Sequence, residues 1–233
     1  MSLSQRTAVP NRVFLAYQWH IYRPIFEQIR TELHRNYPVY FYAIGRPQGQ
    51  PSQALLDKIE TVLWTSTAAV FDASKGNPNV SLEYGMARFI PRVKPYNIYL
   101  LIDENTLPNQ INPGTPIISD LAGATQNRWK LQDQRTLKEH LKAIVEDHPY
   151  TKRFRRYCHD RRLTRGQFRR PLKIIRMFDE RESILRREVL DQLQSEWHGR
   201  RYSDIERLLG DMHKAGLITI TRGREWASRI SIA

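Results

Sequence analysis

A glutamate at position 83 occupies a setting suited to chemistry. An apolar run at residues 68–71 predicts a buried strand, and Asp72 ends that run. Asn77-Pro78 then predicts an N-cap and the first position of a helix. In that helix Glu83 falls on the apolar stripe that faces inward. A carboxylate on an inward face is paired, reaches solvent at the boundary of the core, or is kept for chemistry.

The elements around Glu83 alternate between strands and helices. Apolar runs predict strands at residues 12–17, 39–44, 68–71, 96–102 and 126–129, and helical spacing predicts helices at 22–36, 52–64, 78–88 and 134–147. This alternation predicts an α/β domain with a parallel sheet that helices cover on both faces. The domain is expected to span residues 1–150.

Polar and aromatic residues follow the predicted strands. Tyr17 and Gln18 follow the first strand, Gly45 opens a loop rich in Gly and Pro after the second, and Asp72 ends the third. Ligands of parallel sheets bind at the carboxyl ends of the strands, where the strand order reverses. We therefore expect these residues to surround the carboxylate of Glu83.

Missing motifs argue against a dehydrogenase and a P-loop NTPase. The chain has no G-x-G-x-x-G, no Walker A sequence and no G-x-S-x-G, and its seven His show no metal-ligand spacing. Its one cysteine, Cys158, excludes an intrachain disulfide and a Cys-based zinc site. An acidic, aromatic crevice suits a reaction that passes through an oxocarbenium-like cation, which a carboxylate stabilises or attacks. Cleavage of an N-glycosidic bond, with no cofactor and no metal, is a chemically sensible use of Glu83.

The segment FDASKGNPNVSLEYGMAR resembles the Asp…Asn-Val…Glu-x-Gly-x-Ala segment of the Toll/interleukin-1 receptor (TIR)-like and nucleoside 2-deoxyribosyltransferase-like superfamily. The similarity extends from RVFLAY through ISDLAG to the helix that ends near Asp147. It implies a flavodoxin-like fold, with catalytic roles for Glu83 and Asp72 and with NAD+ or a nucleotide as substrate. The loop after Gly45 resembles the mobile loop that gates the TIR pocket and mediates assembly. The expected substrate contacts are Tyr17, Gln18, Gly45 and Asn79.

Positive charge is concentrated in the second half of the chain. Residues 1–150 hold 16 Lys/Arg against 13 Asp/Glu, whereas residues 151–233 hold 21 against 11. Residues 151–171 alone hold nine Lys/Arg and one acidic residue, with aromatic side chains between them, a mixture that suits phosphates and stacked bases. This segment is expected to be a basic linker, whose plain alternative is a solvated helix. Nucleic-acid contacts are expected from Lys152, Arg153, Arg155, Arg156, Arg161, Arg162, Arg222 and Arg224.

Residues 172–233 predict a small α+β module. Helices are expected at 172–178 and 182–197, and a capping box from Ser203 to Glu206 predicts the start of a third helix that ends at Gly216. Two alternating strands around Arg222 and Arg224 predict a hairpin. The order of helices and hairpin resembles a winged helix. Acidic residues in the third helix favour contact with a nucleic-acid backbone, structured RNA or a single strand over base reading in a groove.

These features favour an effector enzyme that cleaves the N-glycosidic bond of NAD+ or of a nucleoside or nucleotide. A nucleic-acid-binding module would regulate it, an arrangement that resembles bacterial anti-phage effectors of the retron type, and a homo- or hetero-oligomer is expected. The alternative is a non-catalytic, nucleotide-sensing domain coupled to a winged helix that docks on nucleic acid or protein. No apolar segment resembles a signal peptide or a membrane span, so a cytoplasmic protein without a membrane partner is expected.

Overall fold

The computed structural model describes residues 8–44, 52–104, 126–164, 166–179, 181, 183–197, 201–221 and 228–233. The chain divides into two compact units. The first contains residues 1–8, 12–36 and 40–145, and the second contains residues 9–11, 37–39 and 146–233. The main division at residue 145 lies close to the predicted boundary at residue 150.

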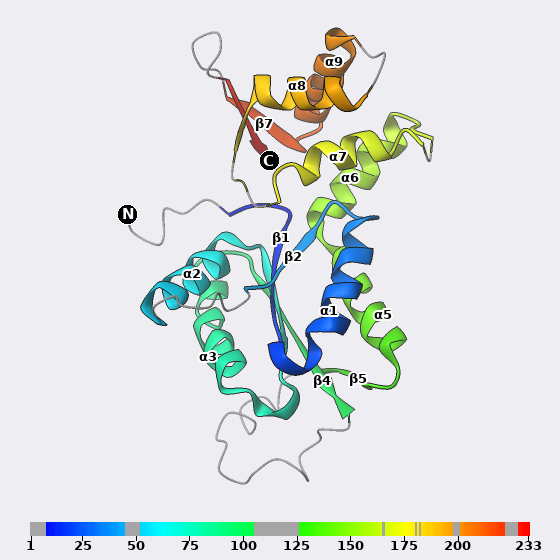
Figure 1. The fold of residues 1–233 in the computed structure, drawn as a ribbon. Helices are drawn as coiled ribbons and strands as arrows, with labels where there is room; N and C mark the ends of the chain where they lie inside the picture. Colours follow the sequence, from blue (N-terminus) through cyan, green and yellow to red (C-terminus); the bar gives the residue numbers. More distant parts are fainter. Residues whose placement is uncertain are drawn as a thin grey trace. The chain divides into compact units, whose positions relative to one another are not determined.

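The first unit is built on a parallel sheet with the strand order β2-β1-β3-β4-β5, which confirms the predicted α/β class (Figure 1). Every neighbouring pair in this sheet is parallel. The chain runs from β1 to β2 at one edge and then crosses back to β3 on the other side of β1, so the strand order reverses between β1 and β3. The strands are β1 (Arg12–Ala16), β2 (Tyr40–Tyr42), β3 (Ala68–Asp72), β4 (Asn97–Asp103) and β5 (Gln126–Trp129).

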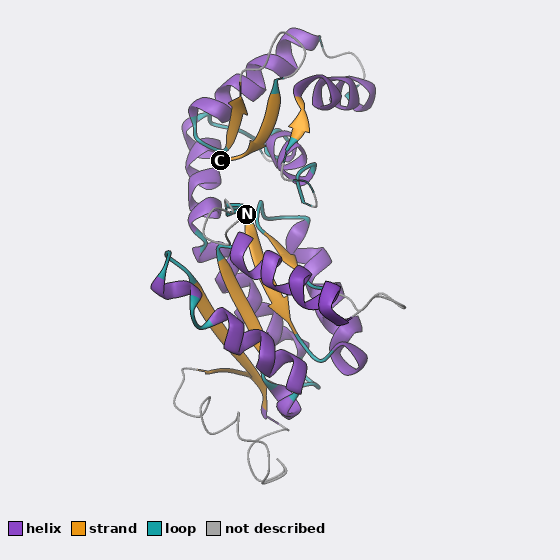
Figure 2. Ribbon diagram, turned by 90° about the vertical axis from the view of Figure 1, so that its left-hand side faces the viewer, coloured by secondary structure: helices purple, strands orange, loops and turns teal. Residues whose placement is uncertain are grey.

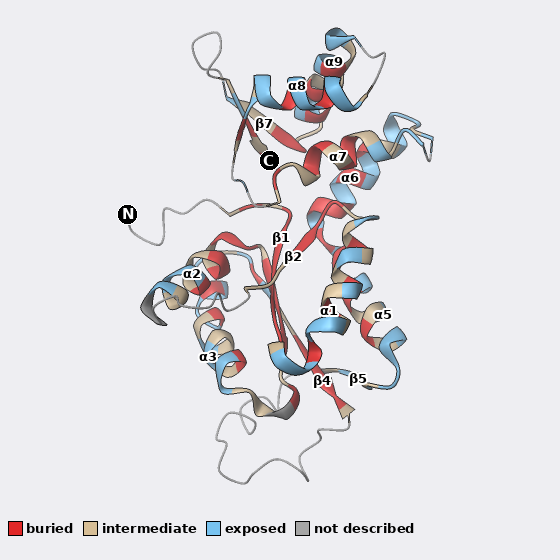
Figure 3. Cartoon of the chain, viewed as in Figure 1, coloured by how far each residue is buried: buried red, intermediate tan, exposed pale blue. Residues whose placement is uncertain are grey.

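Helices cover this sheet on both faces, as Figures 1 and 2 show. Helices α2 (Ser52–Thr65) and α3 (Pro78–Ala87) lie on one face, and α1 (Trp19–His34) and α5 (Gln134–Asp147) lie on the other. Helix α1 begins at Trp19 rather than at Tyr22 as predicted. Both β1 and β3 are buried along their whole length, as the apolar runs predicted (Figure 3).

Alternation along β3 divides its last two side chains between the two faces of the sheet. Phe71 packs in the core under α2 and α3, with its ring centroid 5.8 Å from that of Phe14 and 5.5 Å from that of Tyr84. Asp72 is completely buried on the opposite face, where its Oδ1 accepts hydrogen bonds from Ser74 and from the indole of Trp129.

The second unit combines helices with a small antiparallel sheet of order β6-β8-β7 (Figure 2). Its elements are α6 (Pro149–Asp160), α7 (Arg169–Arg176), β6 (Ile184–Leu185), α8 (Arg186–Glu196), α9 (Tyr202–Lys214), β7 (Ile218–Thr221) and β8 (Arg229–Ile232). The predicted hairpin is confirmed by the pairing of β7 with β8. Its tip, with Arg222 and Arg224, lies outside the described residues.

Two local predictions in this unit are wrong. The expected helix at 182–197 begins only at Arg186, because the two preceding residues form β6 and pair with β8. The capping box from Ser203 to Glu206 does not form, because α9 already begins at Tyr202 after Arg201 and no side chain caps it. Ser203 therefore lies within the first turn of the helix.

The expected basic linker at 151–171 is largely helical. Helix α6 buries Thr151, Phe154 and Tyr157, while its Lys and Arg residues are exposed. Phe154 also packs edge-to-face against Phe168, with ring centroids 5.2 Å apart. The aromatic residues between the basic ones are thus core residues of the second unit. In the part of the chain described, no helix has the length and apolar character needed to span a bilayer.

Gly216 ends α9 in the predicted manner. Its φ is +65°, its N–H donates to the His213 carbonyl at 2.9 Å, and the N–H of Leu217 donates to the Met212 carbonyl at 2.9 Å. These two bonds define a Schellman motif, in which the residue after the C-cap takes the left-handed conformation that glycine adopts without strain.

We expect Gly216→Ala to destabilise the second unit by about 1–2 kcal/mol, because a Cβ is unfavourable in the left-handed conformation. A Cβ at this position would meet only Arg153, 3.9 Å away, so the loss is conformational rather than steric. Gly210→Ala, within α9 and with no atom in reach of its new Cβ, is the control and should stabilise by about 0.5–1 kcal/mol. Urea unfolding measures both, and a neutral Gly216→Ala would contradict the assigned cap.

Candidate active site

Helix α3 carries Glu83 and is anchored at its first turn. The side chain of Asn77 accepts hydrogen bonds from the N–H groups of Asn79 and Val80, at 2.9 and 3.4 Å, and Pro78 occupies the first helical position. Both features confirm the predicted start of this helix. Val80 and Ala87 are buried, so the helix turns the stripe that includes Glu83 toward the sheet.

The Glu83 carboxyl group lines a small cavity at the carboxyl end of β1. The cavity is walled by β1, by the residues that follow β1 and β2, and by α3. Its volume is about 30 Å³, which gives room for a few water molecules. Its lining residues within the described chain are Phe14, Leu15, Ala16, Tyr17, Trp19, Ala43, Ile44 and Glu83.

No hydrogen bond or ion pair to Glu83 occurs within the described part of the chain. Burial alone raises the pKa of this carboxyl group to about 7, because an apolar surrounding disfavours the charged form. At neutral pH the group is therefore divided between its two protonation states. A buried carboxyl group with a pKa near the working pH, in a cavity, can act as a general acid or base or as a nucleophile.

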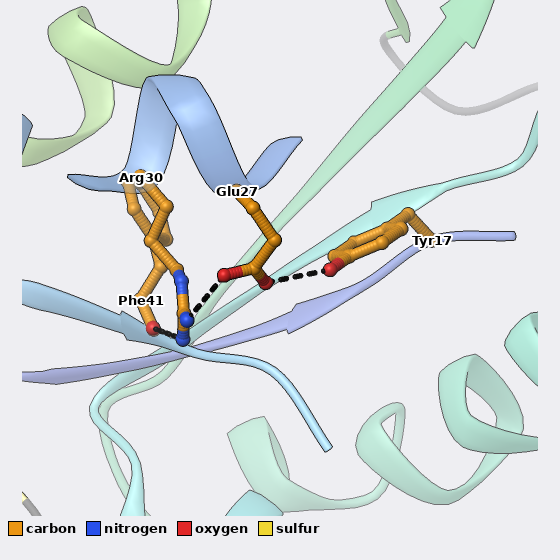
Figure 4. Close-up of polar contacts among 4 residues, drawn as sticks. All are labelled: Tyr17, Glu27, Arg30 and Phe41. Carbon is orange, nitrogen blue, oxygen red and sulfur yellow. Dashed lines mark hydrogen bonds and ion pairs between the residues drawn. The ribbon is translucent and has the colours of Figure 1, made fainter. Parts of the chain in front are cut away.

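A chain of polar contacts holds Tyr17 beside this cavity, as Figure 4 shows. The Tyr17 hydroxyl donates to Glu27 at 2.9 Å, and the other oxygen of Glu27 pairs with Arg30 at 2.5 Å. Arg30 in turn donates to the backbone carbonyl of Phe41 at 3.2 Å. Burial and the contact with Glu27 raise the pKa of Tyr17 far above its usual value, so it is a neutral phenol with a fixed orientation.

Aromatic stacking completes this wall of the cavity. The rings of Tyr17 and Phe26 are parallel with centroids 4.5 Å apart, and the rings of Tyr17 and Trp19 stack at 5.5 Å. The guanidinium of Arg23 lies 4.7 Å from the centroid of Trp19. Tyr17 and Arg23 thus both pack against the Trp19 indole. Trp19 was not among the predicted substrate contacts, although its place two residues beyond Tyr17 in the sequence was a usable signal.

The structure does not bring Asp72 to the side chain of Glu83. Asp72 lies on the opposite face of the sheet, where its Oδ1 accepts from the Ser74 hydroxyl at 2.5 Å and from Trp129 at 3.3 Å. Burial raises its pKa to about 7, and the hydrogen bonds from Ser74 and Trp129 act in the other direction. The geometry gives Asp72 a role in organising the strand ends rather than a place in the cavity.

The other expected substrate contacts are scattered. Gln18 is half-buried at the N-cap of α1, and its amide oxygen is buried without a partner among the described atoms. Asn79 is exposed in the first turn of α3. Gly45 lies outside the described residues.

Most of the described cations expected to bind nucleic acid already have partners. Lys152 pairs with Asp147 at 3.1 Å, Arg155 with Glu146 at 2.8 Å, and Arg161 with Asp211 at 2.6 Å. Arg153 donates to the backbone carbonyls of Gly216 and Ala233 at 2.7 and 3.2 Å.

The remaining two cations, Arg156 and Arg162, are exposed, and the described residues offer neither of them an ion pair. They stay available to an anionic ligand.

No metal site emerges among the residues that the structure describes: no three His, Cys, Asp or Glu side chains gather in a way that could hold an ion. Burial raises the pKa of the Cys158 thiol to about 11, so this cysteine is a neutral, unreactive thiol at physiological pH.

Comparison with known proteins adds no family assignment. No protein-family model matches the chain, and no curated protein matches it.

We expect Glu83→Gln to be more stable than the wild type at pH 8, by on the order of 1–3 kcal/mol. The folded-state pKa of about 7 exceeds the ordinary value of 4.5, so the buried carboxylate destabilises the fold once the pH rises through this interval. Below pH 4 the carboxyl group is protonated in both states and the two proteins should be equally stable.

Urea unfolding at pH 4, 6 and 8 measures this difference. Glu60→Gln, which removes a partly exposed carboxylate from α2, is the control and should show no such change with pH. A Glu83→Gln protein no more stable than the wild type at pH 8 would contradict the burial assigned to Glu83.

Proposed function

We propose that the first unit cleaves the N-glycosidic bond of NAD+ or of a nucleoside or nucleotide. The observation that carries this proposal is the half-buried side chain of Glu83, which has no partner among the described residues and lines a cavity walled by Tyr17 and Trp19. An acidic group beside aromatic side chains suits a substrate that combines a planar base with a sugar carbon that becomes positively charged.

The topology supports the same site. The order β2-β1-β3-β4-β5 supports a flavodoxin-like sheet, a class in which the ligand lies at the carboxyl ends of the strands where the order reverses. That reversal lies between β1 and β3. The cavity lies at the carboxyl end of β1, and Glu83 of α3 lines it. The proposed catalytic helix therefore begins at the point where this class of sheet binds ligands.

In the proposed reaction the bond between the sugar C1′ and the base nitrogen breaks, and its electron pair leaves with the base. The ionised carboxylate of Glu83 stabilises the positive charge on C1′ or bonds to it. Water then bonds to C1′, loses a proton to the solvent and leaves the carboxylate free again. Tyr17, held neutral by burial and by its hydrogen bond to Glu27, supplies a fixed wall for the sugar or base.

The small volume of the cavity supports a regulated site. Among the described residues, the cavity of about 30 Å³ has room for a few water molecules and not for a nucleoside, and we propose that it opens before substrate enters. We propose that assembly or nucleic acid bound by the second unit favours the open form, as in an anti-phage effector.

We expect the wild type to release free base from at least one member of a panel of NAD+, nucleosides and nucleotides when nucleic acid is present. Chromatography of the products measures this release. The value of kcat/KM should rise with pH through about 7 and then level off, because the ionised form of Glu83 is the active one. Glu83→Gln should lower kcat by at least about 1,000-fold.

Glu60→Gln, which removes a carboxylate of α2 that does not line the cavity, is the control for this assay and should leave the rate nearly unchanged. Release that survives in Glu83→Gln would reject the assigned catalytic residue. Intact ligand binding with no release under any condition would instead support the alternative, a non-catalytic domain that senses a nucleotide.

We propose further that the second unit is a winged-helix-like module that binds the backbone of a nucleic acid. The order α7, β6, α8, α9, β7, β8 and the sheet order β6-β8-β7 support this topology. In α9, Glu206 pairs with Arg186 and Asp211 with Arg161, which removes part of the unfavourable charge of that helix. Arg156 and Arg162 are the exposed cations proposed to contact phosphates.

Replacing Arg156 and Arg162 by Gln should weaken binding of a single-stranded oligonucleotide, because an uncharged amide does not neutralise a phosphate. The plot of log K against log salt should become shallower by about 0.7 for each phosphate that is no longer neutralised. Fluorescence anisotropy between 50 and 300 mM salt measures both effects, with replacement of Lys58 on α2 and Lys142 on α5 by Gln as the charge-matched control. Wild-type binding that does not weaken as salt rises would reject an electrostatic contact.

A further inference from the structure

A pocket of about 210 Å³ lies within the second unit, and neither Arg156 nor Arg162 is among its lining residues. It is formed by the segment before α7, by α7 itself, by the residue that ends α8 and by the first turns of α9. Its lining residues are Leu163, Gln167, Arg170, Pro171, Trp197, Asp204, Ile205, Arg207 and Leu208. The pocket thus combines an indole, two guanidinium groups, one carboxylate and an apolar floor.

Trp197 supplies the aromatic surface of this pocket. It follows α8 as its C-cap and is half-buried, so part of the indole is held by the protein and part is open to the pocket. The Arg170 guanidinium lies 5.9 Å from the centroid of the indole. An indole beside a guanidinium is an arrangement that binds a planar base next to a phosphate.

The two guanidinium groups of the pocket differ from their neighbours in having no acidic partner. Within the described chain neither Arg170 nor Arg207 forms an ion pair. Several other cations of this unit do form ion pairs, namely Lys173 with Glu196, Arg161 with Asp211 and Arg186 with Glu206. The pocket therefore has two positive charges that an anion could neutralise.

Asp204 gives the pocket a hydrogen-bond acceptor. It is half-buried in the first turn of α9, and its side chain has no hydrogen bond among the residues described. A carboxylate would repel a bare phosphate, but it accepts a hydrogen bond from the N–H edge of a base. This residue favours a ligand with both a base and a phosphate over a simple anion.

We propose that this pocket binds one nucleotide unit, with its base against Trp197, the N–H edge of the base toward Asp204, and its phosphate between Arg170 and Arg207. The pocket is smaller than the roughly 300–1,000 Å³ of sites for drug-sized ligands, and its size suits a single base. This site goes beyond the proposed backbone contacts of Arg156 and Arg162, because stacking engages the base. It does not depend on the chemistry of Glu83.

The test measures the affinity of the full chain for three probes at fixed salt. They are a 3′-labelled, 5′-phosphorylated oligothymidylate, the same strand with abasic sugars in place of the nucleotides, and free thymidine monophosphate as a competitor. Thymine carries the N–H that Asp204 would accept. Anisotropy reports the two strands, and competition reports the mononucleotide.

Trp197→Ala should weaken oligothymidylate binding by about 5- to 100-fold, the range seen when one base is deprived of its stacking partner. Trp197→Phe keeps an aromatic ring and should stay within about threefold of the wild type. The abasic strand should bind the wild type as weakly as oligothymidylate binds Trp197→Ala. Arg170→Gln should reduce the salt slope by about 0.7, whereas Lys142→Gln should leave affinity and slope unchanged.

Equal affinity of the wild type and Trp197→Ala for oligothymidylate, or equal affinity of the wild type for both strands, overturns the nucleotide pocket and leaves the proposed backbone contacts standing. Absence of binding to any probe overturns both proposals. If these results support the pocket, competition by thymidine monophosphate shows that a free nucleotide is sufficient to fill it. Failure of thymidine monophosphate to compete shows that the ligand is a nucleotide within a strand. Trp197→Phe, Arg170→Gln and the abasic strand keep the test decisive if Trp197→Ala does not fold.

Discussion

The arrangement of the strand ends in the first unit depends on the hydrogen bonds to the buried carboxyl group of Asp72. A charged or polar group with no exposure is costly unless it has partners. Ser74 and Trp129 both donate to Oδ1 of Asp72, whereas Oδ2 is buried without a partner among the described atoms. The Ser74 hydroxyl also accepts from the backbone N–H of Asp103 at 2.8 Å, so the ends of β3, β4 and β5 share one network. Because side chains alternate along a strand, holding Asp72 on one face holds Phe71 on the other. Phe71 then supports Tyr84 and the helix that carries Glu83.

Features of the fold that depend on neighbouring residues could be predicted from the sequence, and those that depend on distant partners could not. Short apolar runs identified the strands, Asn77-Pro78 identified the start of α3, and Gly216 identified the end of α9. Strand β6 was missed because its two residues become a strand only by pairing with β8, far along the chain. The place of Glu83 on the inward stripe was predictable, but the stacking that brings Trp19 to the same cavity was not.

In the basic half of the chain, composition likewise predicts less than the contacts show. A count of Lys and Arg gives the net charge, yet it cannot show which cations are already neutralised. Three of the expected contacts form ion pairs, and Arg153 is used by the backbone at the end of α9. The aromatic residues Phe154 and Tyr157, which in the sequence suggested base stacking, are buried instead. An open aromatic surface lies elsewhere in that unit, at Trp197.

The small volume of the Glu83 cavity has a quantitative consequence under the proposed activity. If substrate binds only to a minor open form, its apparent affinity falls by the fraction of molecules that are open. Each 1.4 kcal/mol in favour of the closed form then lowers that affinity about tenfold. A ligand that binds only the open form could therefore raise turnover many-fold without contacting the substrate. A cell could hold such a protein at considerable concentration and lose little of its nucleotide pool until that ligand arrived.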